Sequence, residues 1–297
     1  YGVGESFGVM LVHRHGWPIQ VATFRTEGPY SDHRRPDHVE VATIEEDAAR
    51  RDFTINGMYW DPVQEQLIDF HDGARDLESG VIRAIGDPAA RLDEDHLRML
   101  RAVRFAARFR FEIEPGTASV IQHNADRLAG ISRERIGEEI RRMLMGANRT
   151  LAAELLEQMG LASAVLGDDQ LAAGEPRHLA SLPAELDREA YPAVLASWAI
   201  DRGSGDMAKL IERWRERLML SNDDRAGLQS VLGLHTNLLT SWESLTIAGQ
   251  KRMAVLPWFN TAVDLTAVDD PEHAEAVRAR VAELAAQGDM APSPWLT

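Results

Sequence analysis

The sequence reads RRDFTIN at residues 50–56 and EDHLRMLRAVRF at residues 94–105, and these two stretches decide the fold. The second stretch predicts an amphipathic helix, because its apolar residues recur every three or four positions. On such a helix Asp95 and Arg98 share one face, with their Cβ atoms about 5 to 6 Å apart. A carboxylate that accepts hydrogen bonds then stands beside a guanidinium that donates them. The spacing therefore predicts a pair that can match the Watson–Crick edge of a nucleotide base.

Further arginines follow Arg98 along the same predicted helix. Arg101 and Arg104 continue its three-residue spacing, and Arg108 and Arg110 lie beyond them. An isolated stripe of this kind is typical of a solvated helix face beside an apolar face. Because RRDFTIN precedes it, we interpret the first three arginines, Arg98, Arg101 and Arg104, as facing a nucleotide, with Arg101 and Arg104 near the triphosphate.

The two stretches resemble motifs of the class II tRNA nucleotidyltransferases, the family of CCA-adding enzymes and bacterial poly(A) polymerases. In that family RRDFTxN handles the ribose and triphosphate, and EDxxR selects C or A without a nucleic-acid template. The resemblance implies sugar and phosphate contacts for Arg51, Asp52 and Asn56. It implies base reading for Asp95 and Arg98.

Other segments resemble the same family in the same order. Residues 68–77, 81–83 and 86–88 are similar to its flexible hinge between head and neck, although Asp72 replaces one glycine of the usual pair. Residues 131–140, ISRERIGEEI, resemble its fifth motif, and residues 19–25 and 32–37 resemble a head strand and the loop after it. The resemblance implies hinge or RNA-binding roles for four residues, namely Asp69, Asp76, Arg83 and Arg135.

Two elements of the family are absent from the sequence, a Gly-Gly-x-Val-Arg-Asp segment and an Asp-x-Asp strand. Phosphoryl transfer of this type uses two Mg²⁺ ions held by carboxylates, and the neutral amide of Gln20 is a poor replacement for such a ligand. We therefore assign no catalytic carboxylate and no metal ligand within the sequence. We expect a Mg²⁺ cofactor whose ligands lie mostly outside it, and a longer protein of which this chain is a fragment.

The pattern predicts an α+β protein with a nucleotidyltransferase-type α/β head, truncated at its start, followed by an all-helical neck and body. We expect the head over residues 1–86, the neck with the nucleotide-recognition motifs over 87–150, and an RNA-binding body over 151–297. The predicted strands of one small sheet cover residues 7–13, 18–24, 38–42, 57–60 and 66–70. The predicted helices cover residues 93–108, 117–124, 135–145, 149–159, 191–201, 207–218, 223–232, 249–256 and 271–287.

Composition limits the partners of the chain. The formal net charge is −15, so any contact with RNA must be local, because phosphate contacts need Lys and Arg. There is no Cys, which suits a cytoplasmic location, and no apolar run approaches the roughly 18 to 20 residues of a membrane span. Five tryptophans after residue 190 predict a helix-packing core. The histidines are dispersed without the paired His-Asp of a phosphohydrolase domain, so we expect no second, metal-dependent phosphatase activity.

The function that these observations favour is template-independent transfer of CMP and AMP from CTP and ATP to an RNA 3′ end. Addition of CCA to tRNA is our first interpretation, and enzymes that add only C or only A share the motifs. Two alternatives stay open. One is poly(A) polymerase activity, which uses the same chemistry. The other is a catalytically inactive chain that binds nucleotide or RNA.

Overall fold

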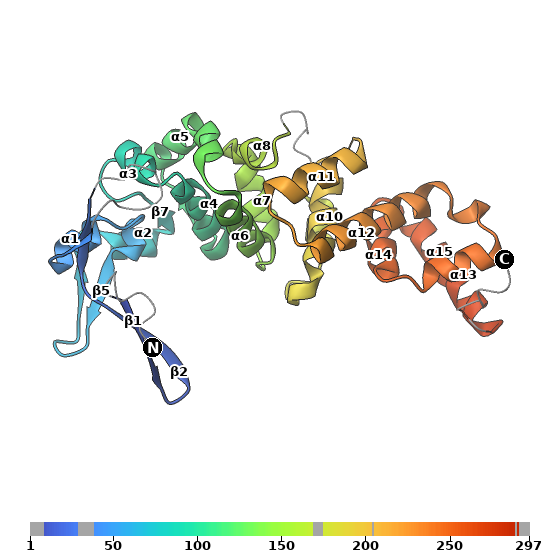
Figure 1. Cartoon of the computed structure of the whole chain (residues 1–297), viewed down its shortest axis with the longest axis horizontal. Helices are drawn as coiled ribbons and strands as arrows, with labels where there is room; N and C mark the ends of the chain where they lie inside the picture. The colour runs from blue at the N-terminus through green and yellow to red at the C-terminus, as the bar shows by residue number, and fades with distance from the viewer. Residues whose placement is uncertain (1–8, 29–38, 169–174, 204, 289, 291–297) are drawn as a thin grey trace. The chain divides into compact units, whose positions relative to one another are not determined.

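The structure is a computed structural model that describes residues 9–28, 39–168, 175–203, 205–288 and 290. The loop at residues 32–35 and Trp295 lie outside the described residues. The chain divides into two compact units, Tyr1–Ser132 and Arg133–Thr297. The first unit combines short strands with helices and the second is helical, which confirms the α+β prediction (Figure 1).

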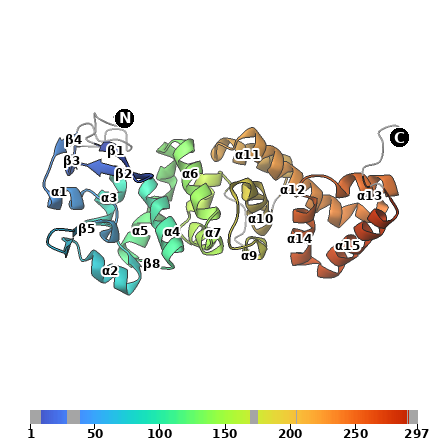
Figure 2. The same cartoon turned by 90° about the horizontal axis from the view of Figure 1, so that it is seen from below.

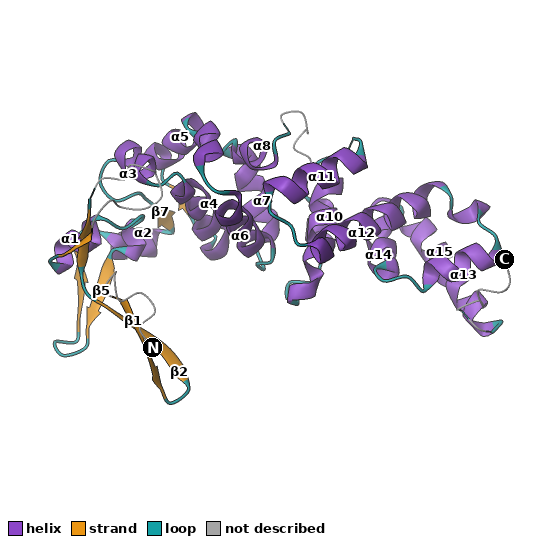
Figure 3. Ribbon diagram, in the orientation of Figure 1, coloured by secondary structure: helices purple, strands orange, loops and turns teal. Residues whose placement is uncertain are grey.

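The strands of the first unit pair as hairpins and short ribbons (Figure 3). The prediction of one small sheet is wrong for the described residues, because their strands form four separate two-stranded sheets. Each strand is only two to six residues long and most find their partner nearby in the sequence, so no common sheet is needed to pair them. The pairs are β1 (Val9–Arg14) with β2 (Trp17–Ala22), β3 (Arg25–Glu27) with β4 (Val39–Val41), β5 (Met58–Asp61) with β6 (Gln66–Asp69), and β7 (Val81–Ile82) with β8 (Glu112–Ile113).

The pairing of β7 with β8 joins the expected head to the expected neck. These two strands are parallel, and Phe53 of RRDFTIN forms a bridge with Ala84 directly after β7. Residues before and after position 86 therefore share one unit, which ends at Ser132, and the three-part division stays a prediction. The helical elements of this unit are α1 (Ile44–Ala49), η2 (Thr54–Asn56), α2 (Gly73–Ser79), α3 (Pro88–Glu94), α4 (Leu97–Phe109), α5 (Pro115–His123) and η3 (Ala125–Gly130).

The core of the first unit lies on α4 and on the phenylalanine of RRDFTIN. Leu100 and Val103 are fully buried, as the apolar spacing predicts, and Phe53 is buried with them. The rings of Phe53 and Phe105 meet edge to face with centroids 5.8 Å apart. RRDFTIN and the arginine-bearing helix are therefore packed together by their apolar side chains.

The second unit is built from helices alone in its described residues (Figure 2). Trp198 and Trp214 are fully buried with ring centroids 5.3 Å apart, and Trp242 is buried against Phe259, which confirms the core prediction for these three tryptophans. No described helix is long and apolar enough to span a membrane. The helical elements are α6 (Arg133–Leu144), α7 (Arg149–Gln158), α8 (Leu161–Leu166), α9 (Arg177–Ser181), η4 (Arg188–Ala190), α10 (Tyr191–Asp201), α11 (Met207–Arg217), α12 (Asn222–Thr240), η5 (Trp242–Ser244), α13 (Ile247–Ala254), α14 (Phe259–Asp269) and α15 (Pro271–Ala286).

Gly73 provides a test of the packing between α2 and RRDFTIN. A methyl group at this position would lie 2.3 Å from the carbonyl oxygen of Thr54, so one of the two backbones has to move. We expect Gly73→Ala to lower the free energy of unfolding by about 3 kcal/mol, measured by urea denaturation. Gly130→Ala is the matched control, because nothing lies within 4 Å of its added methyl group. Equal stability of the two variants would contradict the close approach of α2 to Thr54.

Candidate functional site

Asp52 joins the two motifs. Its Oδ2 accepts a hydrogen bond from Nε of Arg101 at 2.7 Å and forms an ion pair with Nη2 of the same residue at 2.6 Å. Its Oδ1 accepts from the side-chain amide of Asn56 at 2.9 Å. The side chain is buried, which by itself would raise the pKa of Asp52. The charge of Arg101 and the bond from Asn56 outweigh burial, and the pKa is lowered. Three predicted site residues therefore meet around one carboxylate.

Asp47 forms a second buried centre beside the first. Its carboxylate accepts hydrogen bonds from Arg50 at 2.7 Å, from Arg51 at 3.1 Å and from the Tyr59 hydroxyl at 2.5 Å. Burial would raise the pKa of Asp47, but the bonds from Tyr59 and Arg50 lower it to about 2. Burial and the bond to Asp47 in turn raise the pKa of Tyr59 to about 12. Of the three acidic residues at positions 45–47 in α1, Asp47 is therefore a buried partner of Arg51.

Sequence reasoning missed this role of Asp47, because the residue lies outside the motifs that were recognised. The available signal was the spacing of three and four residues to Arg50 and Arg51, which places opposite charges on one helix face. Arg51 also donates from Nη1 to the carbonyl oxygen of Asn56 at 3.0 Å and stacks over Tyr59 with 4.9 Å to the ring centroid. Its side chain is still 38% exposed, so it faces both the core and solvent.

Asp95 does not lie on a helix, which corrects the prediction of one helix over residues 93–108. It ends α3 in an extended conformation, with φ −145° and ψ 103°, and α4 begins two residues later at Leu97. Its Oδ1 accepts the N–H of Leu97 at 3.1 Å, a hydrogen bond that satisfies one of the orphan donors at the start of α4. Its carbonyl oxygen accepts the N–H of Arg98 at 2.9 Å, so Asp95 and Arg98 share the turn that opens α4.

Arg98 is buried, which corrects its expected place on an exposed basic stripe. Its guanidinium forms an ion pair with Glu94 and donates to the carbonyl oxygens of Arg91 at 2.7 Å and Arg50 at 3.2 Å. The turn before α4 brings these acceptors together, and a helical periodicity does not reveal them. Arg98 therefore contacts Arg50, the first residue of RRDFTIN.

Arg101 and Arg104 remain at the surface of α4. The side chain of Arg101 is 34% exposed while it is paired with Asp52. Arg104 is half-buried and stacks over Phe105, with 4.2 Å from its guanidinium carbon to the ring centroid. The predicted stripe is therefore divided, with Arg98 inside the unit and these two arginines partly open to solvent.

The hinge residues form hydrogen bonds within the first unit. Asp69 accepts backbone N–H groups of Gly73 at 3.0 Å and Ala74 at 2.9 Å; burial raises its pKa less than these bonds lower it. Asp76 is buried and accepts from the Thr54 hydroxyl at 2.7 Å and from Arg83 at 3.0 Å. These contacts tie the hinge segment to RRDFTIN. A hinge or RNA-binding role for them stays a prediction.

Two further hinge and RNA-binding positions complete the set. Asp72 adopts the left-handed conformation, with φ 57°, at the start of α2, where the family's glycine pair would cost less. Arg135 lies on α6 in the second unit. Arg135 therefore belongs to another unit than Asp47 and Asp52.

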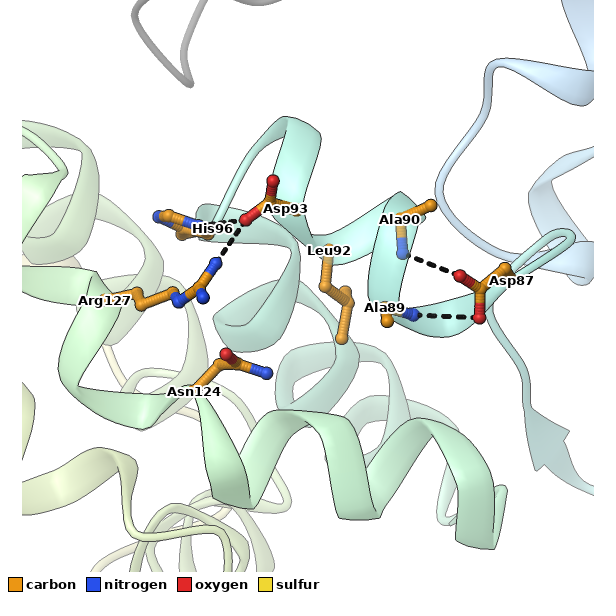
Figure 4. A pocket seen from close by; sticks show the side chains of 8 residues that line it. All are labelled: Asp87, Ala89, Ala90, Leu92, Asp93, His96, Asn124 and Arg127. Carbon is orange, nitrogen blue, oxygen red and sulfur yellow. Dashed lines mark hydrogen bonds and ion pairs between the residues drawn. The ribbon is translucent and has the colours of Figure 1, made fainter.

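A pocket of about 400 Å³ opens beside the turn between α3 and α4 (Figure 4). His96, the residue after Asp95, lines it together with Asp93, which forms an ion pair with Arg127. Asp87 caps the start of α3 by accepting the N–H of Ala90 at 3.2 Å. None of the predicted nucleotide contacts lines this pocket, so it lies next to the predicted base-reading turn and does not contain it.

The carboxylates around RRDFTIN do not fit a magnesium site. Asp47 and Asp52 are both taken up by arginines, and a hard cation needs such oxygens as its own ligands. In the described part of the first unit, no other group of three potential metal ligands lies close together. We therefore derive no catalytic step through Mg²⁺ from these residues.

An acid titration tests the buried position of Asp47. A carboxyl group whose pKa falls to about 2 on folding stabilises the fold above the ordinary Asp pKa of about 3.9, and this contribution disappears as the pH falls toward 2. We expect Asp47→Asn to lower the free energy of unfolding by roughly 2 kcal/mol at pH 7 and by clearly less at pH 3. Glu45→Gln, on the exposed side of α1, should match the unchanged protein at both pH values. A deficit of Asp47→Asn that does not change with pH would refute this account.

Comparison with known proteins decides the family. The poly(A) polymerase head domain matches residues 1–83, and the probable RNA- and SrmB-binding site of polymerase A matches residues 110–169. The CCA-adding enzyme of Lactiplantibacillus plantarum is 35% identical over 247 residues, which cover 81% of this chain and 60% of that protein. That of Ligilactobacillus salivarius is 45% identical over 146 residues, which cover 49% of this chain and 36% of that protein.

A solved structure agrees with these matches. The crystal structure of the Bacillus stearothermophilus CCA-adding enzyme in complex with CTP aligns with a TM-score of 0.72 and 28% identity, covering 95% of this chain and 68% of that one. The chain belongs to the class II tRNA nucleotidyltransferase and poly(A) polymerase family.

Membership in the class II nucleotidyltransferase family confirms the resemblance that the motifs predicted. The head-domain match contains RRDFTIN and the hinge residues, and the second match contains Arg135. Residues 94–105 lie between the two matches, so the roles of Asp95 and Arg98 stay predictions. The chain spans between about a third and three fifths of the length of these two relatives.

Proposed function

We propose that this chain is the nucleotide-selecting part of an RNA nucleotidyltransferase that transfers CMP and AMP from CTP and ATP to the 3′ end of tRNA. The ion pair between Asp52 and Arg101 is the observation that carries the proposal. It joins RRDFTIN to α4 through two contacts between the guanidinium and the carboxylate, at 2.7 and 2.6 Å, so both motifs present their side chains from one packed unit. The relatives at 35% and 45% identity are named CCA-adding enzymes, which supports the same reading.

Three arginines suit the triphosphate. Arg51, Arg101 and Arg104 come from the two fastened segments and are all partly exposed. Guanidinium groups bind phosphate oxygens with paired hydrogen bonds that a lysine cannot match. Asp52 and Asn56 act beneath them, since Asp52 holds Arg101 in place while Asn56 holds Asp52. This arrangement orients a nucleotide before any bond is made or broken.

Asp95 and Arg98 suit the base. Cytosine and adenine both present an exocyclic amine beside a ring nitrogen that accepts, whereas uracil and guanine present a carbonyl where the amine would be. A carboxylate accepts from the amine and a guanidinium donates to the ring nitrogen. Arg98 uses three donor contacts within the protein, and a guanidinium has five N–H groups. The hydrogen bonds of Arg98 within the protein would therefore hold its guanidinium in place, while the remaining N–H groups donate to the base.

The RNA contact is proposed for the region that begins near residue 110. The matching family model over residues 110–169 describes a probable RNA-binding site, and Arg135 lies within it. With a net charge of −15 the chain needs its cations gathered locally to hold RNA. We place this activity in the cytoplasm, and we propose that it depends on Mg²⁺.

Equilibrium binding of the four ribonucleoside triphosphates to the purified protein tests the selection step. We expect CTP and ATP to compete for one site, and UTP and GTP to bind at least about tenfold more weakly, which corresponds to roughly 1.4 kcal/mol. Asp95→Asn should reduce this difference, because an amide can donate to the carbonyl of uracil as well as accept. Equal affinities for all four nucleotides in the unchanged protein would contradict the proposed role of the Asp95–Arg98 turn.

A further inference from the structure

Three residues that are far apart in the sequence converge in the second unit. They are His178 on α9, His235 on α12 and Asp269 at the end of α14. One ring nitrogen of each histidine and one carboxylate oxygen of Asp269 all lie within 4.8 Å of one another. Both histidines are buried and Asp269 is exposed. We propose that these three side chains bind a divalent transition metal ion of the zinc class.

The orientation of His178 suits a metal ligand. Its Nδ1 lies 2.8 Å from Oδ1 of Asp201, and that carboxylate also accepts the backbone N–H groups of His178 at 2.8 Å and Leu179 at 2.9 Å. Because an ionised carboxylate only accepts, Nδ1 carries the proton and Nε2 presents its lone pair. Metal-binding histidines are commonly held in this way by a carboxylate on their other nitrogen.

The lone pair of His178 points at a second negative group. Its Nε2 lies 3.1 Å from Oδ2 of Asp269, and a bare lone pair facing a carboxylate oxygen at this distance is repulsive. A cation between the two atoms removes the repulsion, and that cation is either a proton on Nε2 or a metal ion. Arg177 does not fill this place, because its Nη1 lies 3.5 Å from the other oxygen, Oδ1.

The surroundings of His235 favour a metal ion over a proton on Nε2 of His178. Its Nε2 is buried and has no hydrogen-bond partner, which is costly for a polar atom. Its ring meets that of His178 edge to face, with centroids 6.1 Å apart. A proton on His178 leaves His235 without a partner, whereas a metal ion gives a partner to both rings.

The donor set indicates which metal ion fits. Two imidazole nitrogens and one carboxylate oxygen are typical of Zn²⁺, Co²⁺ and Ni²⁺, and they leave a fourth position open to water. Ligand atoms around a tetrahedral ion with bonds of about 2.0 to 2.1 Å lie roughly 3.4 Å apart. The present spread of up to 4.8 Å therefore needs a closing movement, and the exposed side chain of Asp269 is free to make it.

This site is separate from the nucleotide chemistry proposed for the first unit. Mg²⁺ prefers oxygen ligands, so a site with two imidazoles does not supply the magnesium of nucleotidyl transfer. The inference rests on residues of the second unit alone and stands whether or not the chain selects nucleotides.

Cobalt binding to the metal-free protein tests the proposal. After treatment with a chelator, we expect one Co²⁺ per chain to give a visible absorption band, Zn²⁺ to displace it, and the thermal midpoint to rise when either ion is added. His235→Gln and Asp269→Asn should each weaken binding at least tenfold. Asp269 is exposed, so its variant folds even if a change at buried His235 does not. His273→Gln is the matched control, since His273 contacts the carbonyl oxygen of Leu238 outside the cluster.

Several results would overturn the proposal. If a proton holds His178 and Asp269 together, neither the absorption band nor the shift in thermal midpoint will appear. Cobalt affinity that is unchanged in Asp269→Asn, or that is lost equally in His273→Gln, would place the metal ion elsewhere on the chain.

Discussion

Replacing Asp52 by alanine is expected to lower the free energy of unfolding by about 3 kcal/mol, because it leaves a charge and a hydrogen-bond donor without their partner in a buried place. Arg101 loses both of its bonds to the carboxylate, and Asn56 loses its acceptor. The estimate is at the lower end for buried pairs, because the side chain of Arg101 is 34% exposed and water can replace part of the loss. Urea denaturation followed by circular dichroism measures the change.

Two controls separate charge from packing at this position. Asp52→Asn keeps the volume of the side chain but removes the charge opposite Arg101, so most of the destabilisation should remain. Asp93→Ala removes an ion pair with Arg127 in which both side chains are 50% exposed, and its effect should stay below about 1 kcal/mol. An Asp52→Ala protein as stable as Asp93→Ala would show that the two motifs are not fastened through this carboxylate.

Replacing Arg98 by lysine is expected to remove most of the preference for CTP and ATP over UTP and GTP, a loss of about tenfold or more. Lysine keeps the positive charge beside Glu94, so the fold is disturbed less than by alanine. It cannot reproduce the planar fork that donates both to the carbonyl oxygens within the protein and to a base. Competition binding with the four triphosphates measures the preference.

Arg108→Lys is the matched control for this prediction. Arg108 lies on the same helix and stacks over Phe109, but its side chain is exposed and it belongs to neither motif. The control should keep the preference of the unchanged protein. A preference that survives in Arg98→Lys, or one that is lost equally in Arg108→Lys, would remove Arg98 from base selection.

Local sequence patterns predicted most of the elements. The helix predicted at residues 191–201 coincides with α10, and the strands predicted at residues 57–60 and 66–70 overlap β5 and β6, because apolar spacing and turn residues decide such segments locally. The helix predicted over residues 223–232 continues as α12 to Thr240. Gly233 lies within it, because one glycine weakens a helix without ending it. Phe259–Asp269 was missed as a helix because its polar and apolar residues alternate too irregularly to give a clear face.

The site depends on contacts that sequence spacing does not show. The motifs named Asp52 and Arg101 as site residues, and their side chains are in contact. The break at Asp95 and the burial of Arg98 follow instead from how α3, α4 and the start of RRDFTIN pack. The three side chains near Asp269 come from separate helices, so no periodicity could bring them together. Residue types and spacing within one segment were predictable from the sequence, whereas the contacts that side chains of different segments make required the fold.

The most direct test of the central claim is to sequence the 3′ ends of a tRNA that lacks its terminal CCA after incubation with the purified full-length protein, CTP, ATP and Mg²⁺. The account predicts growth by C, C and A, followed by a stop, and no such growth when UTP and GTP replace CTP and ATP. A long run of A would assign the chain to poly(A) synthesis. Ends that stay unchanged, although CTP and ATP bind, would mean that this protein recognises nucleotides without transferring them.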